Sequence, residues 1–346
     1  MSLYRVGTST CLFPEMPVIT ATGSVVGPRE GQGPLGSLFD LAYRDTAAGE
    51  TSWERGETRM LRQAVDIAMA KAGIADADVD FLLAGDLLNQ IVSSSYAARD
   101  HDVPYLGLYG ACSTMGEGLA LAAFLVAGGF ARNVVVCSSS HHDTAERQYR
   151  YPTEFGYQRV PTSQWTVTAA GAAVVGLSGR GPRIEAATVG RVQDFGVSDA
   201  NDMGSAMAPA FADTVWRHLQ DMSRKPEDYD IIFSGDLGRV GSAIADDLLG
   251  KKGLDIKALH RDTALMIYEM KPEVSSGASG CGCAASVFAA KIWADLASGA
   301  LRRALLVPTG ALHSPITCQQ GESIPCVAHA VSLVGEGSRH TGEVRQ

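Results

Sequence analysis

The sequence has no long apolar run. Its longest one, residues 119–127, is far short of the roughly 20 residues that a membrane-spanning helix needs. The N-terminal stretch has no long apolar core either, so we expect no membrane span and no secretory signal. Basic residues are scattered rather than grouped into a stripe, and the formal net charge is −9. This charge pattern argues against a nucleic-acid partner.

The sequence also lacks a cysteine or histidine pattern typical of a metal site. Its seven cysteines have no regular spacing, and Cys281 and Cys283 form C-x-C rather than the C-x-x-C of zinc and redox sites. Among the histidines, His260, His313 and His329 are scattered along the chain. We therefore expect free thiols in a reducing compartment, no bound metal and no cofactor.

The segments that are present alternate between helix and strand patterns. Apolar residues in 57–72 recur with helical spacing, which predicts an amphipathic helix. Residues 81–84 form a continuous apolar run, typical of a buried parallel strand. A helix over about 91–100 and strands at 105–108 and 133–139 follow. This alternation indicates a layered α/β fold. The first 50 residues are rich in glycine, proline and threonine, so we expect them to be irregular apart from a short strand near residues 17–22.

The second half of the chain repeats the first. The segment DVDFLLAGDLLNQ resembles EDYDIIFSGDLGRVG, which aligns Asp86 with Asp236. Further on, AGGFARNVVVCSSS resembles ASGALRRALLVPTG. With 346 residues the chain is long enough for two such halves, and we place the division at 1–180 and 181–346.

Cys112 lies between a strand pattern and a helix pattern, in the stretch GACST. A thiol at a helix N-terminus has its pKa lowered by the helix dipole and the free amide groups. Cys112 is therefore a candidate nucleophile or pocket-lining thiol. A buried small apolar side chain is the alternative.

Seven segments together resemble the stage V sporulation protein AD family, within the thiolase and ketoacyl-synthase superfamily. They are GPREGQGPLGSLFD, FLLAGDLLNQ, GACST, TAERQYRYPTEFG, DMGSAMAPAFADT, SGDLG and TGALHSP. The resemblance implies a thiolase-like α/β fold of two pseudo-symmetric halves in α-β-α-β-α layers. It also implies a role in sporulation and spore germination. There the protein would bind dipicolinic acid, alone or as its calcium chelate, within a membrane assembly that transports it.

The resemblance to the superfamily also bears on catalysis. Its active members pair the cysteine with two histidines, or a histidine and an asparagine, from the second half. Here Asp236 follows the strand where the first partner is expected, and Ala278 occupies the place of the second. A carboxylate repels a developing oxyanion. We therefore expect a former active site reused for binding, without catalysis.

The expected ligand has an aromatic ring and two carboxylates. The amides of Ser113 and Thr114 at a helix start are candidate carboxylate donors. Arg147 is a candidate cation, and His141, more than His142, a candidate donor. Asp86 and Asp236 could supply oxygens to calcium, although capping the following turn is their simpler role. Further candidates are one more cation and three stacking rings: Arg150, Tyr149, Tyr151 and Tyr157.

Two alternative functions remain open at this stage. One is an acyl-transfer or condensing enzyme with Cys112 as its nucleophile. The other is a structural adaptor with a vestigial pocket. In each case the resemblance implies a peripheral position at the spore inner membrane, with other membrane proteins of the same assembly as partners. It also makes a homodimer possible, in which the edge strands of the sheets of two copies pair. Binding of a partner protein could cover that surface instead.

Overall fold

The computed structural model describes residues 4–149, 159–271 and 274–336. Its strands are β1 (Tyr4–Val6), β2 (Thr10–Leu12), β3 (Val18–Val26), β4 (Leu41–Ala42), β5 (Phe81–Gly85), β6 (Tyr105–Gly107), β7 (Asn133–Ser140), β8 (Trp165–Thr166), β9 (Ala169–Gly176), β10 (Arg183–Thr188), β11 (Ile231–Gly235), β12 (His260–Asp262), β13 (Ala278–Ser279), β14 (Arg303–Ala311), β15 (Cys326–Ala328) and β16 (Ala330–Val334).

The helices lie between and outside these strands. They are α1 (Pro28–Gly31), α2 (Trp53–Ala72), α3 (Val92–Arg99), α4 (Thr114–Ala127), α5 (His142–Tyr149), α6 (Met203–Asp221), α7 (Gly238–Lys251), α8 (Cys281–Val287), α9 (Trp293–Ala297) and α10 (Pro315–Gln319). A π-helical segment, Phe288–Ile292, joins α8 to α9.

The strand order has internal symmetry. The main path runs β12-β11-β14-β16-β10-β3-β9-β7-β5-β6. At one end β12, β11 and β14 are parallel neighbours, and at the other end β6, β5 and β7 are. The pairs β14–β16, β16–β10, β7–β9 and β9–β3 are antiparallel. Each half of the chain thus builds the same five-strand pattern. We propose that the halves divide near residue 180, between β9 and β10.

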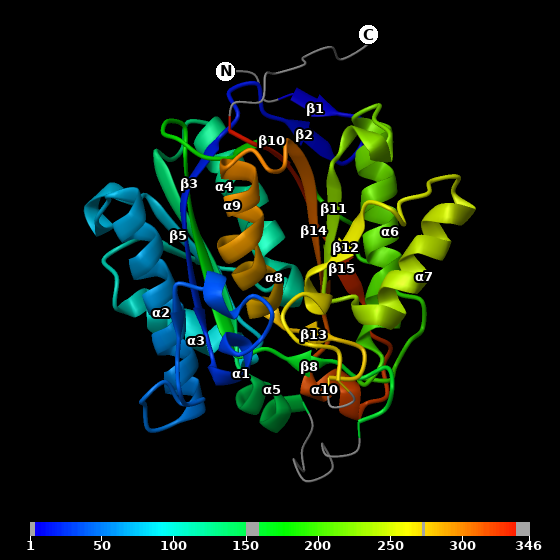
Figure 1. Cartoon of the computed structure of the whole chain (residues 1–346), viewed down its shortest axis with the longest axis horizontal. Coiled ribbons are helices and arrows are strands. Elements are labelled where there is room, and N and C mark those ends of the chain that lie inside the picture. Colours follow the sequence, from blue (N-terminus) through cyan, green and yellow to red (C-terminus); the bar gives the residue numbers. More distant parts are fainter. Residues whose placement is uncertain (1–3, 150–158, 272–273, 337–346) are drawn as a thin grey trace.

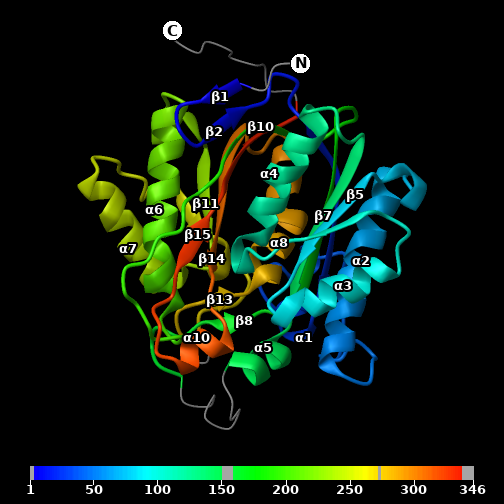
Figure 2. The same ribbon diagram turned by 180° about the vertical axis from the view of Figure 1, so that it is seen from behind.

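The elements stack in five layers, as the sequence predicts (Figures 1 and 2). Helices α4, α8 and α9 occupy the middle. The β3, β5, β7 and β9 strands lie on one side of them and are covered on the outside by α2 and α3. The β10, β11, β14 and β16 strands lie on the other side and are covered by α6 and α7.

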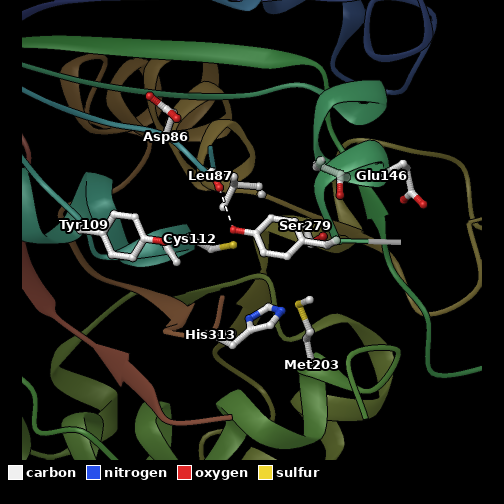
Figure 3. A pocket seen from close by; sticks show the side chains of 14 residues that line it. Asp86, Leu87, Tyr109, Cys112, Glu146, Met203, Ser279 and His313 are labelled. Carbon is white, nitrogen blue, oxygen red and sulfur yellow. Dashed lines mark hydrogen bonds between the residues drawn. The ribbon is translucent and has the colours of Figure 1, made fainter. Parts of the chain in front are cut away.

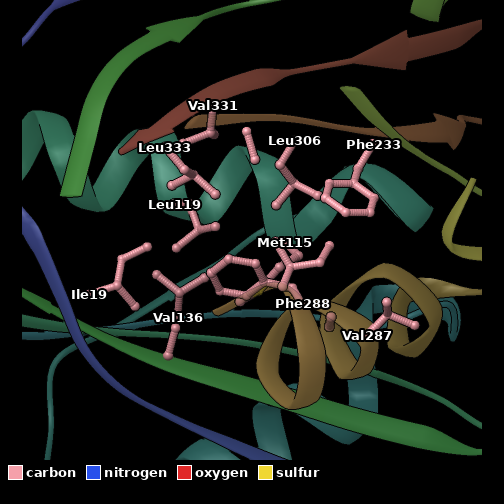
Figure 4. Close-up of a cluster of buried hydrophobic side chains, with 14 of the residues drawn as sticks. Ile19, Met115, Leu119, Val136, Phe233, Val287, Phe288, Leu306, Val331 and Leu333 are labelled. Atoms are coloured by element: carbon pink, nitrogen blue, oxygen red, sulfur yellow. The ribbon is translucent and has the colours of Figure 1, made fainter. Parts of the chain in front are cut away.

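The middle helices carry the largest apolar cluster (Figure 4). Met115 and Leu119 of α4, and Phe288 at the start of the π-helical segment, are fully buried. They lie between side chains of both halves, such as Val136 and Leu306. Burying each such side chain stabilises the fold by roughly 1.5–3 kcal/mol. The low polarity of residues 119–127 is therefore explained by a helix that is buried between two sheets.

The N-terminal region is more ordered than the sequence predicts. Instead of a short strand near residues 17–22, β3 covers Val18–Val26 and pairs along its length with β9 in the middle of the sheet. Its glycine is required by packing, since a Cβ on Gly23 would lie 2.1 Å from the carbonyl oxygen of Ala64 in α2. A glycine that reads as a strand breaker here allows a helix to approach the strand closely.

Candidate functional site

A cavity lies where the ends of strands from both halves meet (Figure 3). Together with its open mouth it encloses about 630 Å³ of empty space. The first half contributes residues after β5 and β6, the turn at Cys112, and α5. The second half contributes Met203 at the start of α6, Ser279 of β13, and the end of β14. Because its lining residues come from both halves of the chain, the cavity forms only when the two halves are packed together.

Cys112 reaches the cavity from a short 3₁₀ turn, Ala111–Ser113, that precedes α4. Ala111 has a left-handed backbone, with φ of 49°. The turn is pressed against β14, since a Cβ on Gly310 would lie 2.0 Å from the Gly110 carbonyl oxygen and 3.0 Å from the Ser113 nitrogen. The position of Cys112 is thus set by a backbone-to-backbone contact between the two halves.

The thiol of Cys112 is not activated in the way the sequence predicts. It is only 5% exposed. Burial raises its pKa well above the usual value, and the neighbouring Asp236 and Cys281 add to the rise. A backbone interaction with Gly280 opposes this effect but is smaller. The expectation of a lowered pKa was wrong because desolvation outweighs the helix dipole at a buried thiol.

We predict that Cys112 resists alkylation. Its thiol is buried and stays protonated at neutral pH, whereas the thiolate is the reactive species. With iodoacetamide under native conditions, peptide mass mapping should show modification of the partly exposed Cys318 long before that of Cys112. In urea the two should react alike. Equal native rates would contradict the protonated state that we assign to Cys112.

Asp236 lies behind Cys112 rather than at the cavity surface, and it is fully buried. Its Oδ2 accepts a hydrogen bond from the Gly280 amide at 2.6 Å, while Oδ1 has no hydrogen-bond partner among the described residues. Burial raises its pKa to about 8, although interactions with the thiols of Cys112 and Cys283 lower it in part. Asp236 is therefore mostly a neutral acid at pH 7.

Asp86 and Asp236 align in the repeat but have different contacts. Asp86 lines the cavity and caps its own turn, accepting from the amides of Leu88 and Ser94 at 2.8 and 2.7 Å. The turn after Asp236 is capped instead by Asp262, which accepts from the amides of Leu237 and Gly238. The capping role that the sequence suggests thus applies to Asp86 and not to Asp236.

A second buried carboxyl, Glu57 of α2, lies next to Asp86. The hydroxyls of Ser139 and Thr144 donate to its two oxygens at 3.0 and 3.1 Å. Burial raises the pKa of Glu57 to about 8, and Asp86 adds to the rise. Burial also raises the pKa of Asp86. A signal for Glu57 was present in the sequence, since the helical spacing of residues 57–72 places it one turn before Leu61 on the apolar face.

Ser113 and Thr114 do not offer their amides to the cavity. The Ser113 amide donates to Gly110 at 3.0 Å, and the Thr114 amide donates to the Ala111 carbonyl. Their hydroxyls are also used within the turn. The expected pair of carboxylate donors is therefore occupied by the turn's own hydrogen bonds.

His141 is fully buried and does not line the cavity. Its Nε2 donates to the Thr46 carbonyl at 2.6 Å, and its Nδ1 accepts from the Asp143 amide at 3.2 Å. This pattern fits the neutral ring, and burial lowers the pKa of His141. Its neighbour His142 stacks on Trp165 with ring centres 3.9 Å apart. Both histidines hold the loop after β7 in place.

Arg147 points away from the cavity. Its guanidinium pairs with Glu54 and lies over the Trp53 ring, and its side chain is half exposed. Helix α5 separates it from the cavity, because Ala145, Glu146 and Tyr149 occupy the inner face. The sequence-based assignment of Arg147 to the ligand is thus not matched by its position. The candidates Arg150, Tyr151 and Tyr157 lie outside the described residues.

The cavity is lined by one ring that the sequence predicted and by one histidine that it did not. Tyr149, one of the expected stacking rings, lines the cavity, and its hydroxyl donates to the Leu87 carbonyl at 2.7 Å. Its ring centre is 5.2 Å from that of His313. His313 faces the same space as Cys112 and Met203 (Figure 3). The internal repeat could have pointed to His313. The repeat aligns β14 with β7, and His313 follows β14 just as His141 and His142 follow β7.

The described part of the chain lacks both a metal-site cluster and a membrane-spanning helix. In residues 4–149, 159–271 and 274–336, no three histidine, cysteine or acidic side chains are grouped as a metal site would need. Within the same part of the chain, no helix is both long and apolar enough to cross a membrane.

Comparison with known proteins gives a family and a fold. The family model of stage V sporulation protein AD (SpoVAD) matches residues 7–334. Stage V sporulation protein AD of Bacillus subtilis (strain 168) is 46% identical over 325 residues, which cover 94% of this chain and 96% of that protein.

Solved structures with the same fold are condensing enzymes. The 3-oxoacyl-(acyl carrier protein) synthase III, FabH, from Pseudomonas aeruginosa PAO1 has a TM-score of 0.57 at 16% identity, covering 94% of this chain and 99% of that chain. The priming β-ketosynthase from the R1128 polyketide pathway has a TM-score of 0.53 at 18% identity, covering 96% and 99%. The thiolase-like fold expected from the sequence is therefore confirmed.

Proposed function

The chain belongs to the stage V sporulation protein AD family, and from this membership we propose that it binds dipicolinic acid without transforming it. In this proposal it is the peripheral component of an assembly at the spore inner membrane that moves dipicolinate during sporulation and germination. The other membrane proteins of that assembly are its partners. The observation that carries the proposal is the cavity at Cys112, in which aromatic and apolar side chains surround a buried thiol.

The walls of the cavity suit a flat aromatic ligand. Apolar side chains such as Leu87 and Met203 line it, and Tyr109 and Tyr149 add two aromatic rings. Such rings stack on a planar heterocycle, while a few polar groups orient it. Thr166, Ser279 and His313 are polar residues of the lining that would face a ligand carboxylate.

The charges around the cavity favour a ligand that arrives with a cation. Asp86 and Glu146 line the described part of the wall, which has no lysine or arginine. Arg159 pairs with Glu146, with its guanidinium 3.4 Å from the carboxylate. A dianion next to these carboxyls requires a proton or a cation to balance the charge. Calcium that enters together with dipicolinate would supply the positive charge, and Glu146 would be an additional oxygen ligand of that calcium.

The site is poorly suited to acyl transfer. A thiol nucleophile needs a base or a lowered pKa, and here burial keeps the Cys112 thiol protonated. The groups beside the thiol are Asp236, Cys281 and the Gly280 amide. The neutral Asp236 offers no base at pH 7. These features support binding over catalysis.

One observation favours the catalytic alternative, in which Cys112 is acylated. His313 lines the same cavity as Cys112 and is a candidate base if the ligand brings the two side chains together. Incubation with acyl thioesters followed by intact-protein mass spectrometry tests this. A mass increase that Cys112→Ala abolishes would support the enzyme.

The edge of the sheet supports a homodimer as a further part of the proposal. β6 is the last strand on its side, and Leu106 within it and Tyr109 just after it are about half exposed. An exposed strand edge with apolar side chains favours pairing with another chain. A second copy would cover it.

We predict saturable dipicolinate binding by isothermal titration calorimetry, stronger with calcium present. Ala145→Phe fills the cavity from the inner face of α5 and should weaken binding at least about tenfold. Arg147→Ala, on the outer face of the same helix, is the matched control and should bind like the parent. Absence of binding by folded parent protein, with or without calcium, would contradict the proposal and favour a structural adaptor.

A further inference from the structure

A second hollow lies on the outer layer, away from the cavity. Its lining residues come from α2, from α3 and from the residues next to these two helices, which lie side by side (Figure 2). Together with its open mouth it encloses about 1140 Å³ of empty space. Arg55, Arg59 and Arg62 of α2 and Arg99 of α3 line it, and Tyr96 forms part of its wall. We call this hollow the arginine groove. It takes no part in the function proposed above.

The three arginines of α2 form a row. Positions 55, 59 and 62 are spaced by four and three residues, so they share one face of the helix. At a rise of 1.5 Å per residue the row is about 10 Å long. Arg99 faces this row from α3 and lies over the Tyr96 ring, with the guanidinium carbon 4.9 Å from its centre. The groove thus presents cations from both sides.

Acidic residues of the same chain hold most of these arginines in place. Arg59 pairs with Glu50 at 3.2 Å, and Arg62 pairs with Asp100 at 3.0 Å. Arg99 shares Asp100 at 3.4 Å. A guanidinium has five N–H donors, and these pairs use only part of that capacity. The side chains of Arg59 and Arg62 are about 40% exposed and that of Arg99 is 66% exposed, so donors remain available to a partner.

The local charge is opposite to that of the whole chain. The groove contains four arginines against Glu50, Glu54 and Asp100. Glu54 also pairs with Arg147, which lies in an adjoining hollow with no further acidic residue in its lining. The two hollows together therefore hold five arginines and three acidic residues, on a chain whose formal net charge is −9. An anionic partner would be attracted to this surface in preference to the rest.

We propose that the arginine groove binds an acidic segment of a partner polypeptide. An extended chain places alternate side chains about 6.6–6.8 Å apart, so two or three carboxylates can reach a row of this length. Arginine forks pair well with carboxylates. The half-exposed Tyr96 and the partly buried Val92 offer apolar contact for the segment's other side chains. A flat bilayer surface would not enter a hollow between two helices.

The test uses the full chain and a fluorescein-labelled decaglutamate peptide, followed by fluorescence anisotropy at low and high salt. The parent should bind saturably at low salt. Arg55→Glu with Arg62→Glu should weaken binding by at least about tenfold, because each arginine–carboxylate contact is charge-assisted. Arg180→Glu with Arg191→Glu makes the same charge change at exposed positions outside the groove and should alter binding by less than about twofold.

Two outcomes would overturn the proposal. Equal loss of binding in the groove variant and the control variant would show that net charge alone attracts the peptide. Tighter binding to phosphatidylglycerol vesicles than to decaglutamate, lost in the groove variant, would assign the groove to lipid headgroups instead. Circular dichroism verifies folding, and Arg55→Gln with Arg99→Gln serves as the second groove variant if the first does not fold.

Discussion

Replacing Gly310 by alanine is expected to displace the Cys112 turn and to remove ligand binding. The new Cβ would lie 2.0 Å from the Gly110 carbonyl oxygen, which belongs to the backbone and has no rotamer to change. Either β14 or the turn must move. Overpacking of this kind costs about 1–3 kcal/mol or more. Urea unfolding and dipicolinate titration of the variant measure the two effects.

The chain provides a matched control for this substitution. Gly250 near the end of α7 has no atom within 4 Å of a built Cβ and no left-handed backbone. Gly250→Ala should leave stability unchanged or raise it by up to about 1 kcal/mol, since alanine favours the helix. If Gly310→Ala were as stable as Gly250→Ala, the tight contact between the two halves would not position Cys112.

Replacing Asp236 by asparagine is expected to flatten the dependence of stability on pH. The pKa of Asp236 is raised to about 8 in the folded chain, against about 3.9 in an unfolded one. Between these values the folded chain holds a proton that the unfolded chain has lost. Rising pH therefore lowers the free energy of unfolding by about 1.4 kcal/mol per pH unit from this group. The loss is complete above about pH 8.

Asparagine resembles the neutral acid and has no proton to lose. Asp236→Asn should match the parent near about pH 3.5, below the unfolded pKa, and exceed it by several kcal/mol at pH 9, measured by urea unfolding at each pH. Glu57, raised to about 8 in the same way, still gives the variant a similar slope of its own. Asp247→Asn, at an exposed site, is the control. A variant with the parent's full slope would show that Asp236 is ionised in the folded protein.

Much of the fold could be predicted because it depends on local patterns. The apolar run at 81–84 and the amphipathic pattern of 57–72 correspond to β5 and most of α2. The repeat that aligns Asp86 with Asp236 predicted two similar halves, and the strand order confirms them. The length of the N-terminal strand β3 was underestimated because a glycine within a strand usually weakens it. Gly23 instead lets helix α2 pack closely against the strand, and no local sequence pattern reveals that contact.

The sequence by itself determined the fold class and the position of a thiol between strand and helix, because these depend on residue order and periodicity, which neighbouring residues already contain. The family was indicated by the resemblance of seven segments to a known family. Only the tertiary structure decided which side chains face the cavity. It buried Cys112, brought His313 into the lining of the same cavity and turned Arg147 outward, because burial and side-chain direction depend on elements far apart in the chain. Desolvation, the largest cause of the raised pKa values of Cys112 and Asp236, arises only in the packed protein.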